Sequence, residues 1–244
     1  MATYKTEGFV LKKRPLGEAD RLYSIFTLEH GKIEAKADGS AKITSKLAGD
    51  LEPFNFCQLM IANGKYFERL AGAKIINKFD SAAADWTTLI LSWALSEGIN
   101  NLTINYLPEP RLYQLLKEIL ANLFQPFERE EKIFQIIQFF WLAFLILGHR
   151  PKINFTEQFL YFDKMRGNYF ETKANLSDKN YLIIPEKLVK ILKEIDQYYQ
   201  SKQNLYLPAR LDKDLLKIFY SLFINHYQLL TNRQFYSFQY LAYV

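Results

Sequence analysis

The sequence predicts an α+β protein of two domains, in which a small five-stranded β-barrel precedes an all-helical domain. Two observations predict this order. Up to residue 79, apolar and polar side chains alternate with a period of two between turn residues, as is typical of short strands. From residue 80, apolar side chains recur at every third or fourth position, as is typical of amphipathic helices. We therefore expect domains at residues 1–79 and 80–244, the second with an irregular insertion at about residues 152–182.

The strands of the first domain are predicted from β-branched and aromatic residues bounded by turn residues. They are expected at residues 4–13, 21–27, 32–38, 55–62 and 66–78. Residues 15–17 bend the chain after the first strand, residues 29–32 close a hairpin, and Asn63-Gly64 favours a tight type I′ turn. Five strands in about 80 residues fit the oligonucleotide-binding barrel, or OB-fold, and a fragment of a β-sandwich fits the same count.

The helices of the second domain follow from their apolar stripes. One stripe contains Trp86, Leu89, Ile90, Trp93 and Ala94, and another spans residues 112–123. Residues 133–147 are apolar almost all round and stop at Gly148, which predicts a buried central helix. Further helices are expected at residues 185–199, where Pro185 suits the first turn, and at 212–230, where Asp212 can cap the start. The turn residues at 164–168 predict a small hairpin or an irregular piece between them.

Cysteine content and hydropathy restrict the compartment. Cys57 is the only cysteine, so an internal disulfide and a zinc site with paired cysteines are both excluded. The start of the chain lacks the features of a secretory signal, and the longest apolar run, residues 139–147, is shorter than the roughly 20 residues that span a bilayer. We expect a cytoplasmic protein.

The sequence contains no recognisable catalytic motif. A glycine-rich phosphate loop, a nucleophile elbow and a His-Glu-x-x-His zinc motif are all absent. The three histidines, His30, His149 and His226, are far apart in the chain and suggest no cluster. Glu18 and Asp20 are interpreted as residues that orient a neighbouring arginine and cap the loop. We expect no catalytic residues, no metal and no cofactor.

The positive charge is concentrated in the first domain. Of the net charge of +5, residues 1–79 contribute +4 and residues 80–244 contribute +1. Basic side chains gather around the first loop, along the third strand and in the small basic loop at residues 39–46. This arrangement favours a polyanion such as nucleic acid, although an ordinary solvated surface carries similar charges.

The motifs of the first domain, taken in order, closely resemble those of the RecO family of bacterial recombination mediators and DNA repair proteins. That family typically shows a G-E-x-D-R turn, an aliphatic strand ending in Thr, an H-G-K hairpin, a basic Gly/Ser loop and an L-x-P-F element. Here these are residues 17–21, 22–27, 30–32, 39–46 and 51–54. Residues 145–151 resemble the family's L-x-G-x-x-P element, and beyond residue 79 the resemblance is otherwise architectural.

The resemblance implies an OB-fold, a helical domain and no enzymatic turnover. It implies binding of single- and double-stranded DNA, annealing of complementary strands coated with single-stranded DNA-binding protein (SSB), and action with RecR to load RecA. It implies a bacterial cytoplasmic protein at the nucleoid during repair, with no membrane partner and no small-molecule substrate. DNA contacts are expected at Lys12, Arg14, Arg21, Lys32, Lys36, Lys42 and Lys46, of which Arg21 and Lys32 occupy motif positions.

The resemblance also implies that the helical domain offers an apolar groove to the acidic, phenylalanine-ended carboxyl-terminal tail of SSB. Burial of an aromatic anchor and pairing of its carboxylates are common at protein interfaces. Basic residues before the central helix or in the last helical segment are candidates for that pairing, and both groups remain open. They are Arg129, Lys132, Lys213, Lys217 and Arg233.

The chain departs from many relatives in the insertion, where they carry four cysteines arranged as a zinc module. This insertion has no cysteine and contains Phe155, Phe162, Tyr169 and Phe170 instead. We expect aromatic packing to replace the stabilising role of the metal, because burial of each ring contributes roughly 1.5 to 3 kcal/mol.

Two other function classes stay open. A protein-interaction scaffold would use the aromatic helical domain as its working surface, which the aromatic content of 16% favours. It predicts little DNA affinity and no effect of charge reversal at Lys42 and Lys46. A nuclease is disfavoured, because the acidic pairs at residues 18/20 and 212/214 do not form one metal-binding cluster.

Overall fold

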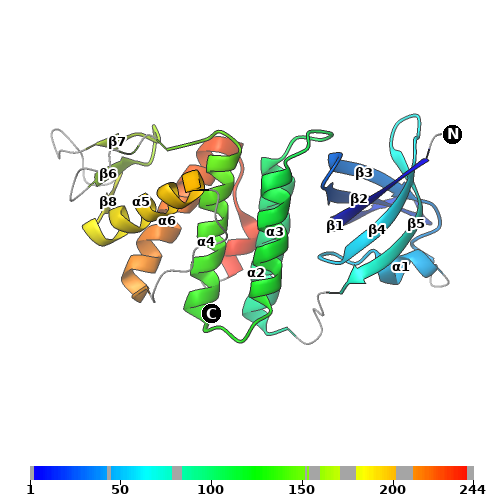
Figure 1. The fold of residues 1–244 in the computed structure, drawn as a ribbon, viewed down its shortest axis with the longest axis horizontal. Helices are drawn as coiled ribbons and strands as arrows, with labels where there is room; N and C mark the ends of the chain where they lie inside the picture. The colour runs from blue at the N-terminus through cyan, green and yellow to red at the C-terminus, as the bar shows by residue number, and fades with distance from the viewer. Residues whose placement is uncertain are drawn as a thin grey trace.

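The computed structural model describes residues 3–42, 45–78, 84–151, 153, 160–170, 180–201 and 211–240. The barrel lies at one end of the elongated molecule, and the helices and a small sheet follow toward the other end (Figure 1). The predicted fold class, an amino-terminal barrel followed by helices, is confirmed. The expected domain boundary near residue 80 falls between the described ranges and stays a prediction.

Five strands close the barrel in the order β1-β2-β3-β5-β4. Their bounds are β1 Thr3–Leu16, β2 Asp20–Thr27, β3 Gly31–Ala37, β4 Phe56–Ala62 and β5 Glu68–Asn77, with helix α1 at Lys46–Asp50. Strand β1 pairs antiparallel with both β2 and β4, and β3 pairs parallel with β5. The alternation predicted from the sequence points Val10, Tyr23 and Ile33 into the barrel core. This closed five-stranded barrel is an OB-fold.

Two local predictions for the barrel are wrong. Strand β1 continues past Pro15 to Leu16, three residues beyond its predicted end, so the chain turns at residues 17–19 instead of 15–17. Asn63-Gly64 does not form a two-residue turn, because β5 begins only at Glu68, where it pairs with Ala35 of β3. The short helix α1 follows the basic loop, in a segment for which no element is predicted.

The helical domain is built around one buried helix. The helices are α2 Trp86–Leu102, α3 Pro110–Leu123, α4 Arg129–Ile146, α5 Glu186–Ser201, α6 Lys213–Thr231 and α7 Tyr236–Gln239. Helix α4 is the predicted central helix, and its aromatic side chains, including Phe140 and Trp141, are buried. It ends before Gly148, which adopts a left-handed conformation with φ of +82°. Asp212 caps α6 as predicted, by accepting a hydrogen bond from the Leu215 amide at 2.8 Å.

The insertion contains a small sheet rather than only an irregular piece. Its strands are β6 Leu160–Asp163, β7 Tyr169–Phe170 and β8 Tyr181–Ile184, in the order β7-β6-β8. The predicted hairpin is present between β6 and β7. Phe162 packs against Tyr169 with ring centroids 5.1 Å apart, and the Tyr169 hydroxyl lies 2.8 Å from Nε2 of His226. Phe155 lies outside the described residues.

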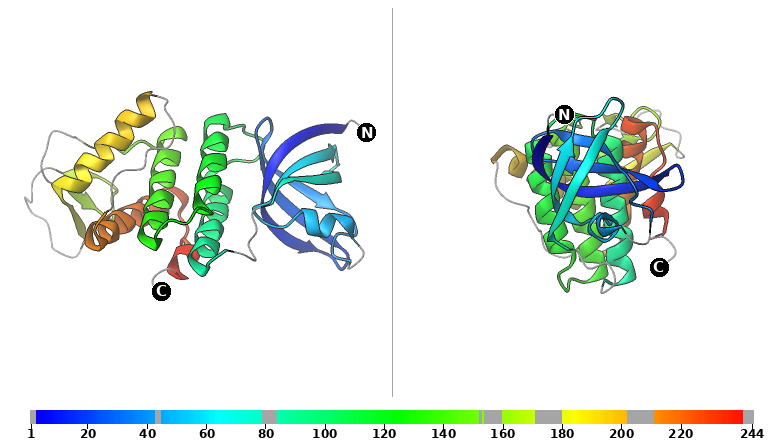
Figure 2. Two further views of the ribbon diagram at one scale, coloured as in Figure 1. Left: turned by 60° about the horizontal axis from the view of Figure 1, so that its bottom comes forward. Right: turned by 90° about the vertical axis from the view of Figure 1, so that its right-hand side faces the viewer.

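The outer face of the barrel packs into the hydrophobic core of the helical domain, and the barrel interior forms a second core. Phe9 and Phe26 on the outside of the barrel pack against Tyr113 of α3, with ring centroids 5.4 and 6.0 Å apart. The β2–β3 hairpin also contacts the α2–α3 connection, where the Tyr106 amide donates a hydrogen bond to the Lys32 carbonyl at 2.9 Å. Figure 2 shows the barrel from its outer end, with the helical domain directly behind it.

Membrane insertion receives no support from the helices. Within the described ranges, none is both long enough and apolar enough to cross a bilayer.

Candidate nucleic-acid interface

Asp20 holds the basic loop against the barrel. Its Oδ1 accepts a hydrogen bond from the Gly39 amide at 2.8 Å, and its Oδ2 lies 2.7 Å from Nζ of Lys36. The hydrogen bond from Lys36 lowers the pKa of the Asp20 carboxyl, so it stays ionised at neutral pH. The carboxylate therefore holds the basic loop through Gly39 and Lys36, rather than orienting Arg21 as expected.

Three predicted DNA-binding residues share the outer face of the barrel. Lys12 and Arg14 are two residues apart on β1, so they point to the same face. Arg14 pairs in register with Leu22, which pairs with Lys36 on β3. We call Lys12, Arg14 and Lys36 the cationic strip. Arg21 is in register with the inward-facing Ala37, so it lies on the opposite face of the sheet at the mouth of the barrel.

The charges of the strip differ in how far they are compensated. Lys36 lies 2.7 Å from Asp20 and 2.8 Å from Asp38, which together raise its pKa and balance its charge. Arg14 makes one longer contact of 3.5 Å with Glu34.

Other predicted residues keep their charge uncompensated. Lys12, Arg21 and Lys42 form no ion pair with a carboxylate in the described part of the chain. Lys12 and Lys42 are also exposed. Lys46 is the first residue of α1, and its side chain lies outside what the structure describes. Of the predicted DNA-binding residues with described side chains, Lys12, Arg21 and Lys42 are therefore the ones whose charge is not balanced by a carboxylate in the described part of the chain.

Lys32 does not share this surface. Its side chain is 8% exposed, and its ammonium donates hydrogen bonds to the carbonyls of Asn100 and Thr103 at the end of α2. Burial lowers the pKa of this ammonium. The favourable position of a cation at a helix carboxyl terminus explains why a motif lysine is buried here. We therefore remove Lys32 from the predicted DNA contacts and assign it to domain docking.

The residues considered for the SSB tail do not converge on one groove. Lys132 is buried, and its ammonium lies 2.8 Å from Asp85 and 2.7 Å from the Thr88 hydroxyl. Burial raises the pKa of Asp85, but the bonds from Lys132 and Thr88 outweigh this effect and lower it to about 2. Lys132 is therefore structural.

The other candidates for the tail are split between two places. Lys213 and Lys217 lie near the start of α6, and Lys213 contacts Glu130 of α4 at 3.2 Å. Arg129 is the first residue of α4. Arg233 lies elsewhere, beside α2, where it donates to Oδ1 of Asn101 at 2.7 Å.

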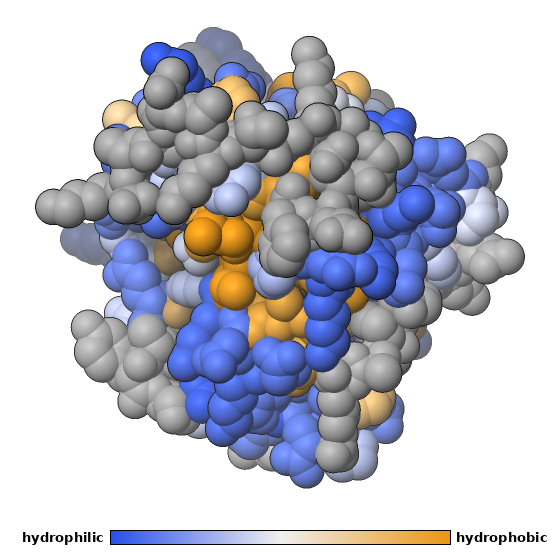
Figure 3. All heavy atoms as spheres, turned by 90° about the vertical axis from the view of Figure 1, so that its left-hand side faces the viewer, coloured by the Kyte–Doolittle hydropathy of each residue, from blue (hydrophilic) through white to orange (hydrophobic). Residues whose placement is uncertain are grey.

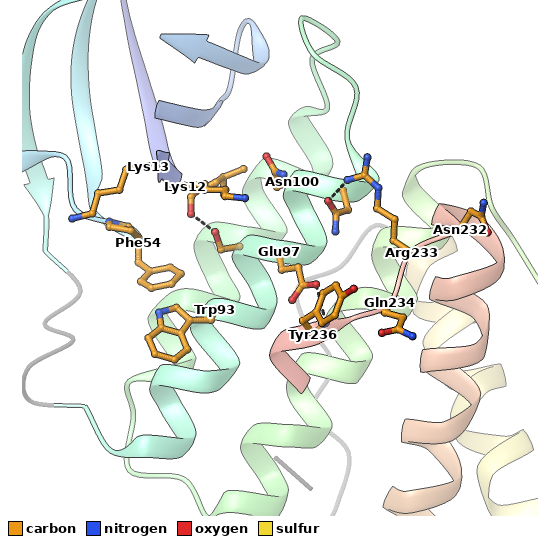
Figure 4. A pocket seen from close by; sticks show the side chains of 14 residues that line it. Lys12, Lys13, Phe54, Trp93, Glu97, Asn100, Asn232, Arg233, Gln234 and Tyr236 are labelled. Atoms are coloured by element: carbon orange, nitrogen blue, oxygen red, sulfur yellow. Dashed lines mark hydrogen bonds between the residues drawn. The ribbon is translucent and has the colours of Figure 1, made fainter. Parts of the chain in front are cut away.

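A groove of about 970 Å³ separates the barrel from the helical domain. One wall is formed by residues 11–13 of β1 and the loop at 53–54, and the other by residues 232–236. Its floor is the face of α2 that carries Trp93, Ser96, Glu97, Asn100 and Asn101 (Figure 4). We call this the interdomain groove. Lys12 links it to the cationic strip.

The walls of the interdomain groove are hydrogen-bonded to its floor. The Ser96 hydroxyl donates to the Leu11 carbonyl of β1, and the Ser24 hydroxyl lies 2.9 Å from Oδ1 of Asn100. Glu97 accepts hydrogen bonds from the amides of Tyr236 and Ser237 at 2.9 and 2.7 Å. The groove is thus a preformed feature of the domain interface.

Two exposed aromatic residues of this groove were not predicted as site residues. Trp93 belongs to the apolar stripe predicted for α2, but it is 43% exposed, and Tyr236 of α7 is 61% exposed. A signal was available for Trp93, because the polar residues 96, 97, 100 and 101 follow it on one helical face. Tyr236 had no such signal, because α7 spans only four residues.

The opposite end of the molecule carries a different kind of surface. Figure 3 shows hydrophobic atoms in the middle of this end, with hydrophilic residues around them. A pocket of about 500 Å³ in the helical domain is lined by Arg150, Arg166, Leu229 and Leu230, among others. Asp196 contacts Arg150 at 2.5 Å.

Comparison with known proteins finds relatives that are similar to part of this chain. A sequence model described as "Recombination protein O N terminal" matches residues 1–79, which contain all five strands of the barrel. The protein from Gloeothece citriformis, named DNA repair protein RecO, is 33% identical over 151 residues, 62% of this chain and 53% of the relative. A protein of the same name from Nostoc sp. is 36% identical over 121 residues, 50% of this chain and 41% of the relative.

A third relative of that name, from Cutibacterium acnes, is 32% identical over 127 residues, 51% of this chain and 52% of the relative. The chain thus spans about half the length of the curated relatives it matches. The aligned stretches are longer than the barrel and include part of the helical domain. Residues 1–79 thus match the family model of the recombination protein O amino terminus, and about half of the chain or more is similar to proteins named DNA repair protein RecO.

Proposed function

We propose that this protein is a recombination mediator of DNA repair that binds single- and double-stranded DNA and anneals complementary strands coated with SSB. Acting with RecR, it would load RecA onto the repaired strand. The observation that carries the proposal is an OB-fold that matches the recombination protein O amino-terminal model and whose uncompensated cations, Lys12, Arg21 and Lys42, lie on and around one barrel.

The proposed mechanism needs no chemical step. Phosphates neutralised by the barrel cations repel one another less, so two strands can approach on or near the same protein. Base pairing then releases free energy by itself. The protein is therefore proposed to act without catalytic turnover and without a cofactor, by raising the rate of encounter between strands.

Tethering to SSB would raise the local concentration of coated strands. An acidic tail that ends in phenylalanine needs an apolar pocket with nearby cations. The pocket lined by Leu229, Leu230, Arg150 and Arg166 has that composition, and we propose it for the tail. No surface is assigned to RecR.

The scaffold alternative rests on the aromatic content of the helical domain. Phe139, Phe140, Phe144 and Phe223 are fully buried and pack against one another, so these rings form the core. Trp86, Trp93 and Tyr236 are exposed, and DNA binding is therefore the property that separates the two functions.

An annealing assay tests the proposal. Two complementary SSB-coated oligonucleotides are mixed with wild-type protein or with the Lys42→Glu/Lys46→Glu variant, and binding to single-stranded DNA is followed by fluorescence anisotropy across a salt series. Wild-type protein is expected to anneal the strands quickly. The variant is expected to anneal slowly and to lose roughly 1.4 from the slope of log affinity against log salt, about 0.7 for each lost phosphate contact.

The matched control is Lys193→Glu, which makes the same change at an exposed position on α5, at the end of the molecule away from the barrel (Figure 1). It should anneal like the wild type. Absence of annealing and of salt-dependent DNA binding by the wild-type protein would refute the proposed function in favour of a scaffold.

A further inference from the structure

We infer that the interdomain groove binds single-stranded DNA, with unpaired bases stacked on Trp93 and Tyr236. The inference rests on the proposed function and deepens it, because it names the form of DNA and the place where bases, rather than phosphates, are held. It requires aromatic surface, positive charge and a preformed shape in one groove.

The aromatic surface is exposed inside the groove. Trp93 is 43% exposed and Tyr236 is 61% exposed, although large apolar side chains of this kind are usually buried. Figure 4 shows the ring of Phe54 beside that of Trp93, with Tyr236 further along the groove. Phe54 is only 6% exposed, so its ring supports that of Trp93 and leaves Trp93 and Tyr236 as the rings open to a ligand. Exposed rings of this kind stack on any base, because every base has an aromatic face.

The charge of the groove suits a phosphate backbone. Three cations, Lys12, Lys13 and Arg233, line it against one carboxylate, Glu97. Glu97 is already bonded to the amides at the start of α7, and Lys13 is paired with Glu52. The partner of Arg233 is the neutral amide of Asn101, so its positive charge is retained. A strand attracted by the cationic strip would reach the groove at Lys12.

The shape of the groove is fixed before DNA arrives. The hydrogen bond of Ser24 holds β2 to α2, that of Ser96 holds β1 to α2, and Glu97 holds the start of α7 to the same helix. A rigid site loses less conformational entropy on binding than one that must form. The rings are therefore positioned to receive bases rather than to collapse onto one another.

Stacking in this groove distinguishes single strands from duplex. In a duplex the bases are stacked and paired inside the helix, so their faces cannot reach Trp93, whereas phosphates remain available to Lys12 and Arg233. The groove therefore predicts that loss of Trp93 weakens binding to single strands selectively.

The test compares affinities of Trp93→Ala and wild-type protein for oligo(dT) and for a duplex of equal length, by fluorescence anisotropy at one salt concentration. Trp93→Ala should lose roughly 5- to 150-fold in affinity for oligo(dT), the range measured for removal of one base stack. Its affinity for duplex should be unchanged. Trp93→Tyr should recover most of the loss, and Tyr236→Ala provides a second variant at a still more exposed position.

The matched control is Tyr240→Ala, which removes an exposed aromatic side chain that lies outside the groove lining. It should bind both ligands like the wild type. Arg233→Gln should lower the salt slope for oligo(dT) by roughly 0.7.

Wild-type protein that binds neither ligand would refute the proposed function itself. Wild-type protein that binds both, with Trp93→Ala and Tyr236→Ala unchanged for oligo(dT), would refute only the groove. Selective loss of an SSB tail peptide by Trp93→Ala, with DNA binding intact, would also overturn the inference and assign the groove to a peptide.

Discussion

His226 occupies an environment that strongly disfavours its charged form. It is 8% exposed and lies among Trp141, Phe162 and Tyr169, with ring centroids 5.3, 5.0 and 5.7 Å away. Its one polar contact there is the Tyr169 hydroxyl, at 2.8 Å. Burial lowers the pKa of the imidazole to about 4, from an ordinary value of 6.5.

This pKa predicts a loss of stability in mild acid. Between pH 6.5 and 4 the imidazole of the unfolded chain binds a proton that the folded protein does not, so the free energy of unfolding falls as the pH falls. The loss from this residue should be about 3 kcal/mol over that window. Urea denaturation of wild-type protein and His226→Gln between pH 7 and 4 should show curves that converge toward acid.

Carboxyl groups titrate over the same pH range as this imidazole. The informative quantity is therefore the difference in the free energy of unfolding between wild-type protein and His226→Gln. His149→Gln removes an imidazole at an exposed position and controls for the loss of a histidine as such. Parallel curves for wild type and His226→Gln would show that His226 does not contribute.

At the level of elements, the β6–β7 hairpin is held by aromatic packing. Phe162 of β6 is fully buried between Tyr169 and His226. Among the residues that the structure describes, no three His, Cys, Asp or Glu side chains are grouped to hold a metal. A zinc ion with cysteine ligands does not fit this insertion, because its sequence has no cysteine.

Purified protein is therefore expected to contain no stoichiometric zinc, and a chelator should leave its melting temperature unchanged. Phe162→Ala should lower the free energy of unfolding by about 3 to 5 kcal/mol, because it opens a cavity in a packed site. Phe170→Ala, on the same hairpin but only half-buried, should cost less. One equivalent of zinc by elemental analysis would contradict this account.

The elements themselves were largely predictable from periodicity, and their exceptions have physical reasons. The strands alternate because one face packs in a barrel, and α4 reads as apolar because it is surrounded on all sides. Helix α1 spans only five residues, too few for a periodic pattern, and the parallel pairing of β3 with β5 depends on contacts distant in sequence.

The candidate site was predictable only in part, because residue type does not report burial. Lys12 and Lys42 were identified by charge alone, and the structure leaves both exposed. Lys32 carries the same charge but is buried against the end of α2. Trp93 belongs to the apolar stripe predicted for α2, and only the packing of β1 on α2 shows that it lines a groove.

At the scale of the whole molecule, the hairpin at residues 30–32 forms a close contact between the barrel and the helical domain. Gly31 lies so close to the α2–α3 connection that an added Cβ would stand 2.1 Å from the Leu107 carbonyl oxygen. Next to it, the Lys32 ammonium binds the Thr103 carbonyl at 2.7 Å. Since the outer face of the barrel also packs into the core of the helical domain, we expect wild-type protein to unfold in a single cooperative transition.

Gly31→Ala tests this contact, and Gly39→Ala is its matched control. Both glycines have φ of +66°, so alanine brings a similar backbone strain of about 1 kcal/mol at either position. The added methyl group meets only the Lys42 side chain at 3.9 Å at residue 39, but it collides with backbone at residue 31. Gly31→Ala should therefore lose about 1 to 3 kcal/mol more than Gly39→Ala in urea denaturation, because the domains must separate to admit the methyl group. Equal losses would show that the hairpin does not set the contact between the domains.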